Sequence, residues 1–77
     1  MQKKEILIKK LTEENDELQR KITGLEFFIG EPDFDELSWE CQRLLETQLS
    51  AMKAYETSLR MRISLIKNDK NLKQKTE

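Results

Sequence analysis

With 77 residues, the chain is long enough for one small domain at most, because so short a chain buries too little surface for a large core. Charged residues make up 38% and hydrophobic residues 36%, a balance typical of long solvated helices with a narrow apolar face. One cysteine and no histidine exclude an internal disulfide framework and the usual zinc or histidine-based catalytic sites. We therefore expect a non-enzymatic protein without metal, cofactor or membrane span.

A first helix is predicted over residues 3–29. Apolar residues recur every seven positions on two interleaved lines, interrupted by one asparagine: Ile8, Asn15, Ile22 and Ile29, and Leu11, Leu18 and Leu25. Spacings of three and four residues place both lines on one side of a helix. Gly30 is expected to end this helix in the left-handed conformation, and Pro32 cannot continue it.

A turn is predicted over residues 30–37, and a second helix over residues 38–68. Asp33 and Glu36 have the spacing of a capping box and predict a short helical turn. Ser38 is the expected N-cap of the long second helix. Residues 69–77 contain one apolar side chain and are expected to form a frayed tail.

The second helix also carries two lines of residues that we expect to face the first helix. They are Leu45, Met52, Leu59 and Ile66, and Cys41, Gln48, Tyr55 and Arg62. A loop this short favours an antiparallel return over one continuous helical zipper. The resulting register pairs Leu18 with Met52 and Asn15 with Tyr55, and Cys41 is expected to be a small core residue.

Several apolar residues remain outside these lines and indicate self-association. Phe28, Leu44, Leu49 and Ile63 widen the apolar surface beyond what one partner helix covers. The predicted fold is therefore an all-α, coiled-coil-like antiparallel two-helix hairpin. Its core is expected to be completed by homo-oligomerisation, as a four-helix bundle in a dimer.

The charges predict an electrically polar rod. Residues 1–10 carry a net charge of +3, residues 11–50 carry −8, and residues 51–77 carry +4. An antiparallel hairpin brings the two basic segments to one end, where an anion would bind. The candidate ligand or partner-binding residues are Gln48, Lys53, Tyr55, Arg60, Arg62 and Lys67.

The line formed by Gln48, Tyr55 and Arg62 has two interpretations. Tyrosine can stack on a base, and arginine can grip phosphate with its planar guanidinium group. The structural alternative is that these polar residues fix the register of the helices. Basic residues are too interleaved with acids to favour nucleic acid as the partner.

A resemblance to a known family rests on Gln48-Leu49, Ala51-Met52, Tyr55 and Arg62-Ile63, preceded by Glu17-Leu18 and Lys21-Ile22. This pattern, between Glu14 and Ile63, resembles a family of short, largely uncharacterised bacteriophage proteins. Its members are known from crAss-like phages and from phages of Gram-positive bacteria. The resemblance implies a phage accessory protein made in the host cytoplasm, and it implies no established activity.

Three functions remain open at this point. The first is a protein that binds a host defence or phage protein, for host takeover or counter-defence. The second is an oligomeric sponge that sequesters an anionic nucleotide second messenger of bacterial immunity. The third is a purely structural coiled-coil adaptor.

Overall fold

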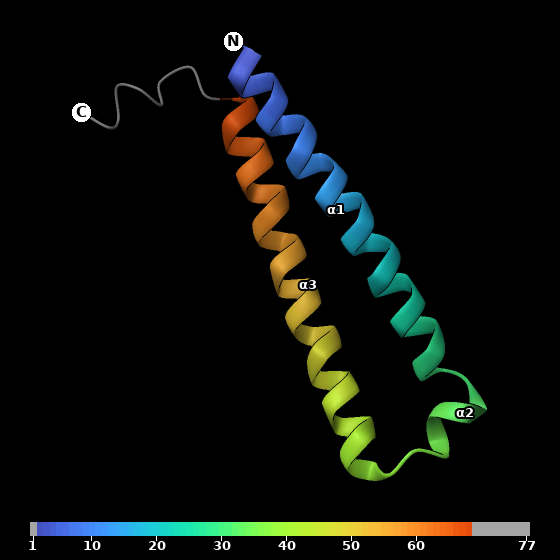
Figure 1. Ribbon diagram of the computed structural model, residues 1–77. Coiled ribbons are helices and arrows are strands. Elements are labelled where there is room, and N and C mark those ends of the chain that lie inside the picture. The colour runs from blue at the N-terminus through green and yellow to red at the C-terminus, as the bar shows by residue number, and fades with distance from the viewer. Residues whose placement is uncertain (1, 69–77) are drawn as a thin grey trace.

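The computed structural model describes residues 2–68, so the tail predicted for residues 69–77 lies outside the described part. The chain forms α1 (Gln2–Ile29), α2 (Pro32–Asp35) and α3 (Trp39–Lys67). α1 and α3 run antiparallel, and the short α2 lies in the connection between them (Figure 1). The molecule measures 53 × 21 × 13 Å, which is a rod of two long helices side by side.

The start of α3 follows the prediction closely. The Ser38 hydroxyl accepts a hydrogen bond from the Cys41 amide at 3.2 Å and so caps the helix. Glu40 in the first turn and Lys67 in the last turn have the charges that the helix dipole favours at each end.

The end of α1 is formed differently from the prediction. No described residue has a positive φ, so Gly30 does not adopt the left-handed conformation. Instead, the amide of Gly30 donates to the Phe27 carbonyl at 3.1 Å, and the Glu31 amide donates to the Phe28 carbonyl at 2.9 Å. These bonds between residues three apart tighten the last turn before Pro32 opens α2. Asp33 consequently lies within α2 and does not cap it.

The burial pattern shows which residues lie between the long helices. On α1, both predicted lines are buried or half-buried. On α3, one predicted line is correct, but the second lies one residue later along the chain than predicted. The inward residues of α3 are Gln42, Leu45, Leu49, Met52, Glu56, Leu59, Ile63 and Ile66.

The second predicted line of α3 is therefore wrong. Cys41, Gln48, Tyr55 and Arg62 are all exposed, and Cys41 is a free surface thiol. The observed register places Leu49 and Ile63 inward where the prediction placed Gln48 and Arg62, and this choice buries more apolar surface. Leu49 and Ile63 are accordingly part of the hairpin interface, whereas the predicted register placed them outside it.

The fully buried core is small. It consists of Leu11, Ile22, Phe34 and Leu59, of which Leu59 has an exposed fraction of 0%. Leu18 and Met52, which the predicted register paired, are half-buried. So small a core agrees with the limited surface that a two-helix chain can bury.

The turn end of the rod is closed by aromatic and amide contacts. Phe34 of α2 packs edge-on against Phe28, with ring centroids 6.0 Å apart and ring planes at 90°. The Gln42 side-chain amide donates to the Leu37 carbonyl at 3.0 Å and to the Asp35 carbonyl at 3.3 Å. Phe28 is thus half-buried against α2, and Gln42 ties α3 to the loop before it.

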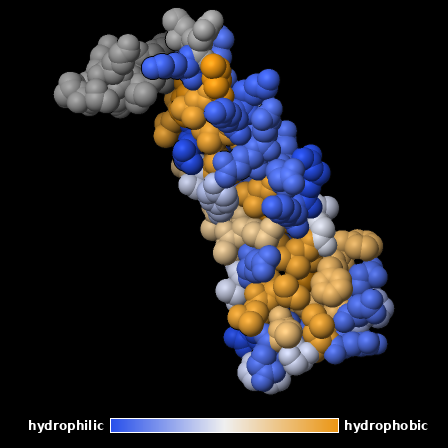
Figure 2. Space-filling view, viewed as in Figure 1, coloured by the Kyte–Doolittle hydropathy of each residue, from blue (hydrophilic) through white to orange (hydrophobic). Residues whose placement is uncertain are grey.

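Much apolar surface nevertheless remains exposed. Figure 2 shows hydrophobic atoms near the turn and again toward the opposite end of the rod. Leu44, Leu65 and Phe27 have exposed fractions of 69%, 70% and 69%. Within residues 2–68, no helix is both long enough and apolar enough to cross a membrane.

Candidate anion-binding groove

Two of the predicted ligand-binding residues are occupied by contacts between the helices. The Lys53 ammonium group pairs with the Glu26 carboxylate at 2.7 Å. The Tyr55 hydroxyl donates a hydrogen bond to the Glu14 carboxylate, and this bond raises the pKa of the Tyr55 hydroxyl. Both side chains therefore link α3 to α1, as the structural interpretation of Tyr55 requires.

The other members of the predicted polar line do not form a groove with Tyr55. The Gln48 side-chain amide contacts the Met52 sulfur at 3.8 Å, which is a weak interaction within α3. Arg62 is exposed. In place of Asn15 and Tyr55, the side-chain pair that crosses the middle of the interface is Gln19 with Glu56, at 2.6 Å.

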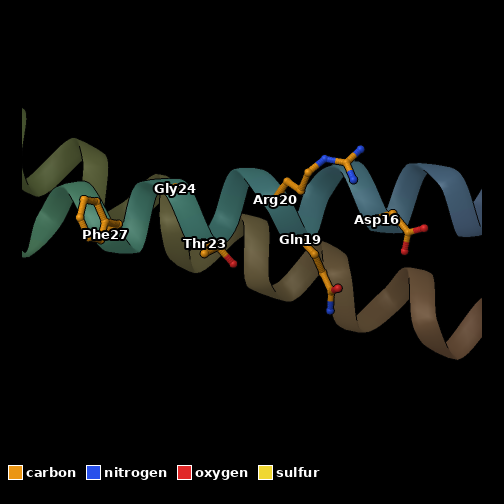
Figure 3. A pocket seen from close by; sticks show the side chains of 6 residues that line it. All are labelled: Asp16, Gln19, Arg20, Thr23, Gly24 and Phe27. Atoms are coloured by element: carbon orange, nitrogen blue, oxygen red, sulfur yellow. The ribbon is translucent and has the colours of Figure 1, made fainter.

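One hollow lies on the outer side of α1 and has a volume of about 680 Å³. Two of its polar side chains are already engaged, because Arg20 pairs with Glu17 at 2.7 Å and Gln19 bonds Glu56. The hydrogen bond from Arg20 also lowers the pKa of the Glu17 carboxyl. In Figure 3, Arg20 points away from α3 and Gln19 points toward it, so the two do not converge on one ligand position.

A second hollow, of about 400 Å³, lies between α1 and α3 in the half of the rod that is far from the turn. We call it the basic groove. It is lined by Thr12, Asn15, Arg60, Ile63, Ser64, Lys67 and Asn68. Its volume falls within the range of small-molecule sites.

The basic groove combines groups that suit an anionic, hydroxyl-bearing ligand. Arg60, Ser64 and Lys67 follow one another at spacings of four and three, so one face of α3 presents two cations and a hydroxyl. Thr12 and Asn15 add a hydroxyl and an amide from α1. None of the described residues that line the groove carries a carboxylate.

Asn15 is the most unusual residue of the groove. Its Oδ1 atom is buried and has no hydrogen-bond partner among the described residues. A buried acceptor without a donor costs about 1–3 kcal/mol. Because this atom is buried, a ligand donor reaches it only if the Asn15 side chain rotates toward the groove.

Sequence reasoning found part of this groove. Arg60 and Lys67 were predicted to bind a ligand, and they do lie together. Thr12, Ser64 and Asn68 were missed because single hydroxyls and amides on a helix carry no motif of their own. The available signal was spacing: Thr12 lies three residues before Asn15, Ser64 lies four after Arg60, and Asn68 lies four after Ser64. Among the described residues, no cluster of acids or thiols is arranged to hold a metal ion.

These features define a helical hairpin with a small basic site between its helices, an arrangement suited to binding. A model of the Sequestin family matches residues 5–65, which is most of the chain. The chain therefore belongs to the Sequestin family. No curated protein and no solved structure matches the chain.

Proposed function

We propose that this protein is a non-enzymatic sponge that binds an anionic nucleotide signal in the basic groove and withholds it from its receptor. The observation that carries the proposal is that Arg60 and Lys67 line the same groove, whose described lining has no carboxylate. Phosphate is the anion that such a pair of cations suits best. The family name, Sequestin, supports a role in sequestration.

The resemblance to short phage proteins gives this activity a setting. In this proposal a bacteriophage makes the protein in the host cytoplasm, where bacterial immunity uses nucleotide second messengers. Binding alone then serves counter-defence, because each sequestered molecule is lost to its receptor. Stoichiometric action requires abundant protein and tight binding, and it requires no catalytic residue.

The first experiment is a thermal-shift screen followed by calorimetry. The probes are cyclic mononucleotides, cyclic dinucleotides, linear adenine nucleotides and inorganic phosphate. A ligand that binds the folded state raises the melting temperature in proportion to the logarithm of its concentration. Ligand recovered after heat denaturation should be chemically unchanged. Recovery of a cleaved product would contradict the proposal that the protein only sequesters its ligand.

Two matched pairs of variants locate the site. Arg60→Gln and Lys67→Gln remove charges from the basic groove, whereas Arg62→Gln and Lys53→Gln remove charges of the same type elsewhere on α3. A lost charge-assisted contact is worth about 1.5–3 kcal/mol, so each groove variant should weaken binding about tenfold or more. Equal losses in Arg60→Gln and Arg62→Gln would place the ligand outside the groove.

The exposed apolar side chains favour a second candidate, which is binding to a host defence or phage protein. Trp39, Leu44 and Leu65 each expose at least 65% of their surface. If no nucleotide shifts the melting temperature but a host protein co-purifies at a fixed stoichiometry, this second function replaces the first.

A further inference from the structure

α3 carries a second face that α1 does not cover. Residues at spacings of three and four lie on one side of a helix. One such set on α3 is exposed along its whole length and contains no charged residue: Leu44, Thr47, Ala51, Ala54, Ser58, Met61 and Leu65. We call this set the uncharged stripe. It extends over about 30 Å at 1.5 Å per residue.

The composition of the uncharged stripe is unusual for this chain. Charged residues make up 38% of the sequence, yet seven consecutive positions of the stripe carry none. Its large apolar members, Leu44, Met61 and Leu65, have exposed fractions of 69%, 61% and 70%. Such a surface is costly to leave in water.

The stripe is also self-complementary in the antiparallel direction. With a two-fold axis beside Ala54, Leu44 faces Leu65 of a second copy, and Thr47 faces Met61. Ala51 then faces Ser58, and Ala54 faces its own equivalent. Small residues therefore meet at the centre, where they allow the two helices to approach closely, and large apolar residues meet at both ends.

The distribution of charged residues also favours the antiparallel direction. The antiparallel pair places Arg62 near Gln48 of the other copy, so this arginine meets no second cation across the contact. The antiparallel pair also sets residues 39–50 of each α3 helix, with a net charge of −1, beside residues 58–68 of the other, with a net charge of +3. These opposite net charges make the arrangement favourable.

We infer that two copies of this chain associate through the uncharged stripes of their α3 helices, antiparallel and with Ala54 at the two-fold axis. The contact buries apolar side chains on the side of α3 opposite α1, which the hairpin alone leaves exposed. Arg60 lies one residue, and so about 100° around the helix, from Met61. Ser64 and Asn68, which also line the basic groove, lie three residues after Met61 and Leu65, so the groove borders the contact at one edge. Each groove is nevertheless lined by one chain alone, and each dimer carries two grooves.

The first test places a charge at the axis. In Ala54→Glu, two carboxylates face each other across the contact, and the dissociation constant of the dimer should rise about tenfold or more. The matched control, Thr23→Glu, adds the same charge at an exposed position of α1 outside the stripe. Light scattering should give twice the 9.2 kDa chain mass for the wild type and the control, and a lower mass for Ala54→Glu. A monomeric wild type at micromolar concentration overturns the inference.

The second test reads the register by cysteine crosslinking in a Cys41→Ser background. A disulfide requires Cα atoms within about 7 Å of each other. A54C should therefore crosslink to its own equivalent on oxidation, whereas A51C should not. Crosslinking of both variants indicates a parallel pair, and crosslinking of neither indicates a different face. Either result overturns the inference.

Dimerisation and ligand binding can be tested separately. Ala54→Glu should remain helical by circular dichroism and retain the ligand affinity of the basic groove, because Ala54 is exposed and does not line the groove. Loss of ligand binding in this variant, with the helix content intact, overturns the statement that one chain alone forms the ligand site. The pairing itself is measured without any ligand.

Discussion

The two ends of the rod differ in how completely their polar groups are satisfied. At the turn, Phe34 is 96% buried against Phe28 and other neighbours, its exposed fraction being 4%, and Gln42 bonds two loop carbonyls. In the half beyond the middle of the rod, the basic groove holds Arg60, Lys67 and the unpartnered Oδ1 of Asn15. The turn end is packed and hydrogen-bonded, whereas the other end contains a buried oxygen without a hydrogen-bond partner.

The largest loss of stability is expected from a substitution at the turn end of the rod. Phe34→Ala removes a buried ring and its contact with Phe28, and a change of this kind typically costs about 3–5 kcal/mol. The melting temperature measured by circular dichroism should fall steeply. Phe27→Ala is the matched control, because the Phe27 ring is 69% exposed and its loss should cost little. Equal destabilisation by the two variants would contradict the assigned role of Phe34.

A smaller effect of opposite sign is expected at the groove. Asn15→Leu replaces a buried, unpaired acceptor by an apolar side chain of similar volume, and should raise the free energy of unfolding by about 1–3 kcal/mol. Gln19→Leu is the control, because the Gln19 amide already bonds Glu56 at 2.6 Å and gains nothing from removal. Urea titration measures both variants. A destabilised Asn15→Leu would show that the amide is satisfied in solution.

The Asn15→Leu variant also tests whether Asn15 takes part in ligand binding. If Asn15 is kept for ligand recognition, Asn15→Leu should bind the screened ligand more weakly although it is the more stable protein. Gain of stability with loss of binding is the expected trade-off when a polar group at a site is held for function. If Asn15→Leu increased both the stability and the ligand affinity, Asn15 would serve only to fix the register of the two helices.

The difference between the ends also explains what the sequence could predict. Heptad spacing located both long helices, and the Ser38 cap was read from its residue type alone. Heptad spacing gave the wrong second line of α3. Gln48 and Leu49 are neighbours in the sequence, and a line through either residue fits an amphipathic helix. Only the packing against α1 selects Leu49 and Ile63, and that choice moved Cys41 and Arg62 to the surface.

The candidate site was partly predictable for a similar reason. Charge counting identified the basic end and drew attention to Arg60 and Lys67. It could not separate them from Lys53, whose partner Glu26 lies 27 positions earlier in the chain and becomes a neighbour only in the folded hairpin. The groove-lining hydroxyls of Thr12 and Ser64 likewise become neighbours only across the helix pair.

The smallest expected effect concerns the hydrogen bond between Tyr55 and Glu14, which joins the helices between the two ends. This bond raises the pKa of the Tyr55 hydroxyl above its usual value of about 10, because ionisation would break the bond and set tyrosinate beside a carboxylate. A group whose pKa is raised on folding stabilises the fold below its unfolded pKa, and that contribution is lost as the pH rises through the folded pKa. The wild type should therefore be slightly more stable than Tyr55→Phe at about pH 8, and this difference should shrink as the pH rises above about 10. Comparison of the two melting temperatures at each pH cancels the titration of the lysines, which both proteins share. A difference that is constant across this range would mean that the Tyr55 hydroxyl does not hold α3 to α1 through Glu14, and that Tyr55 is available to a ligand after all.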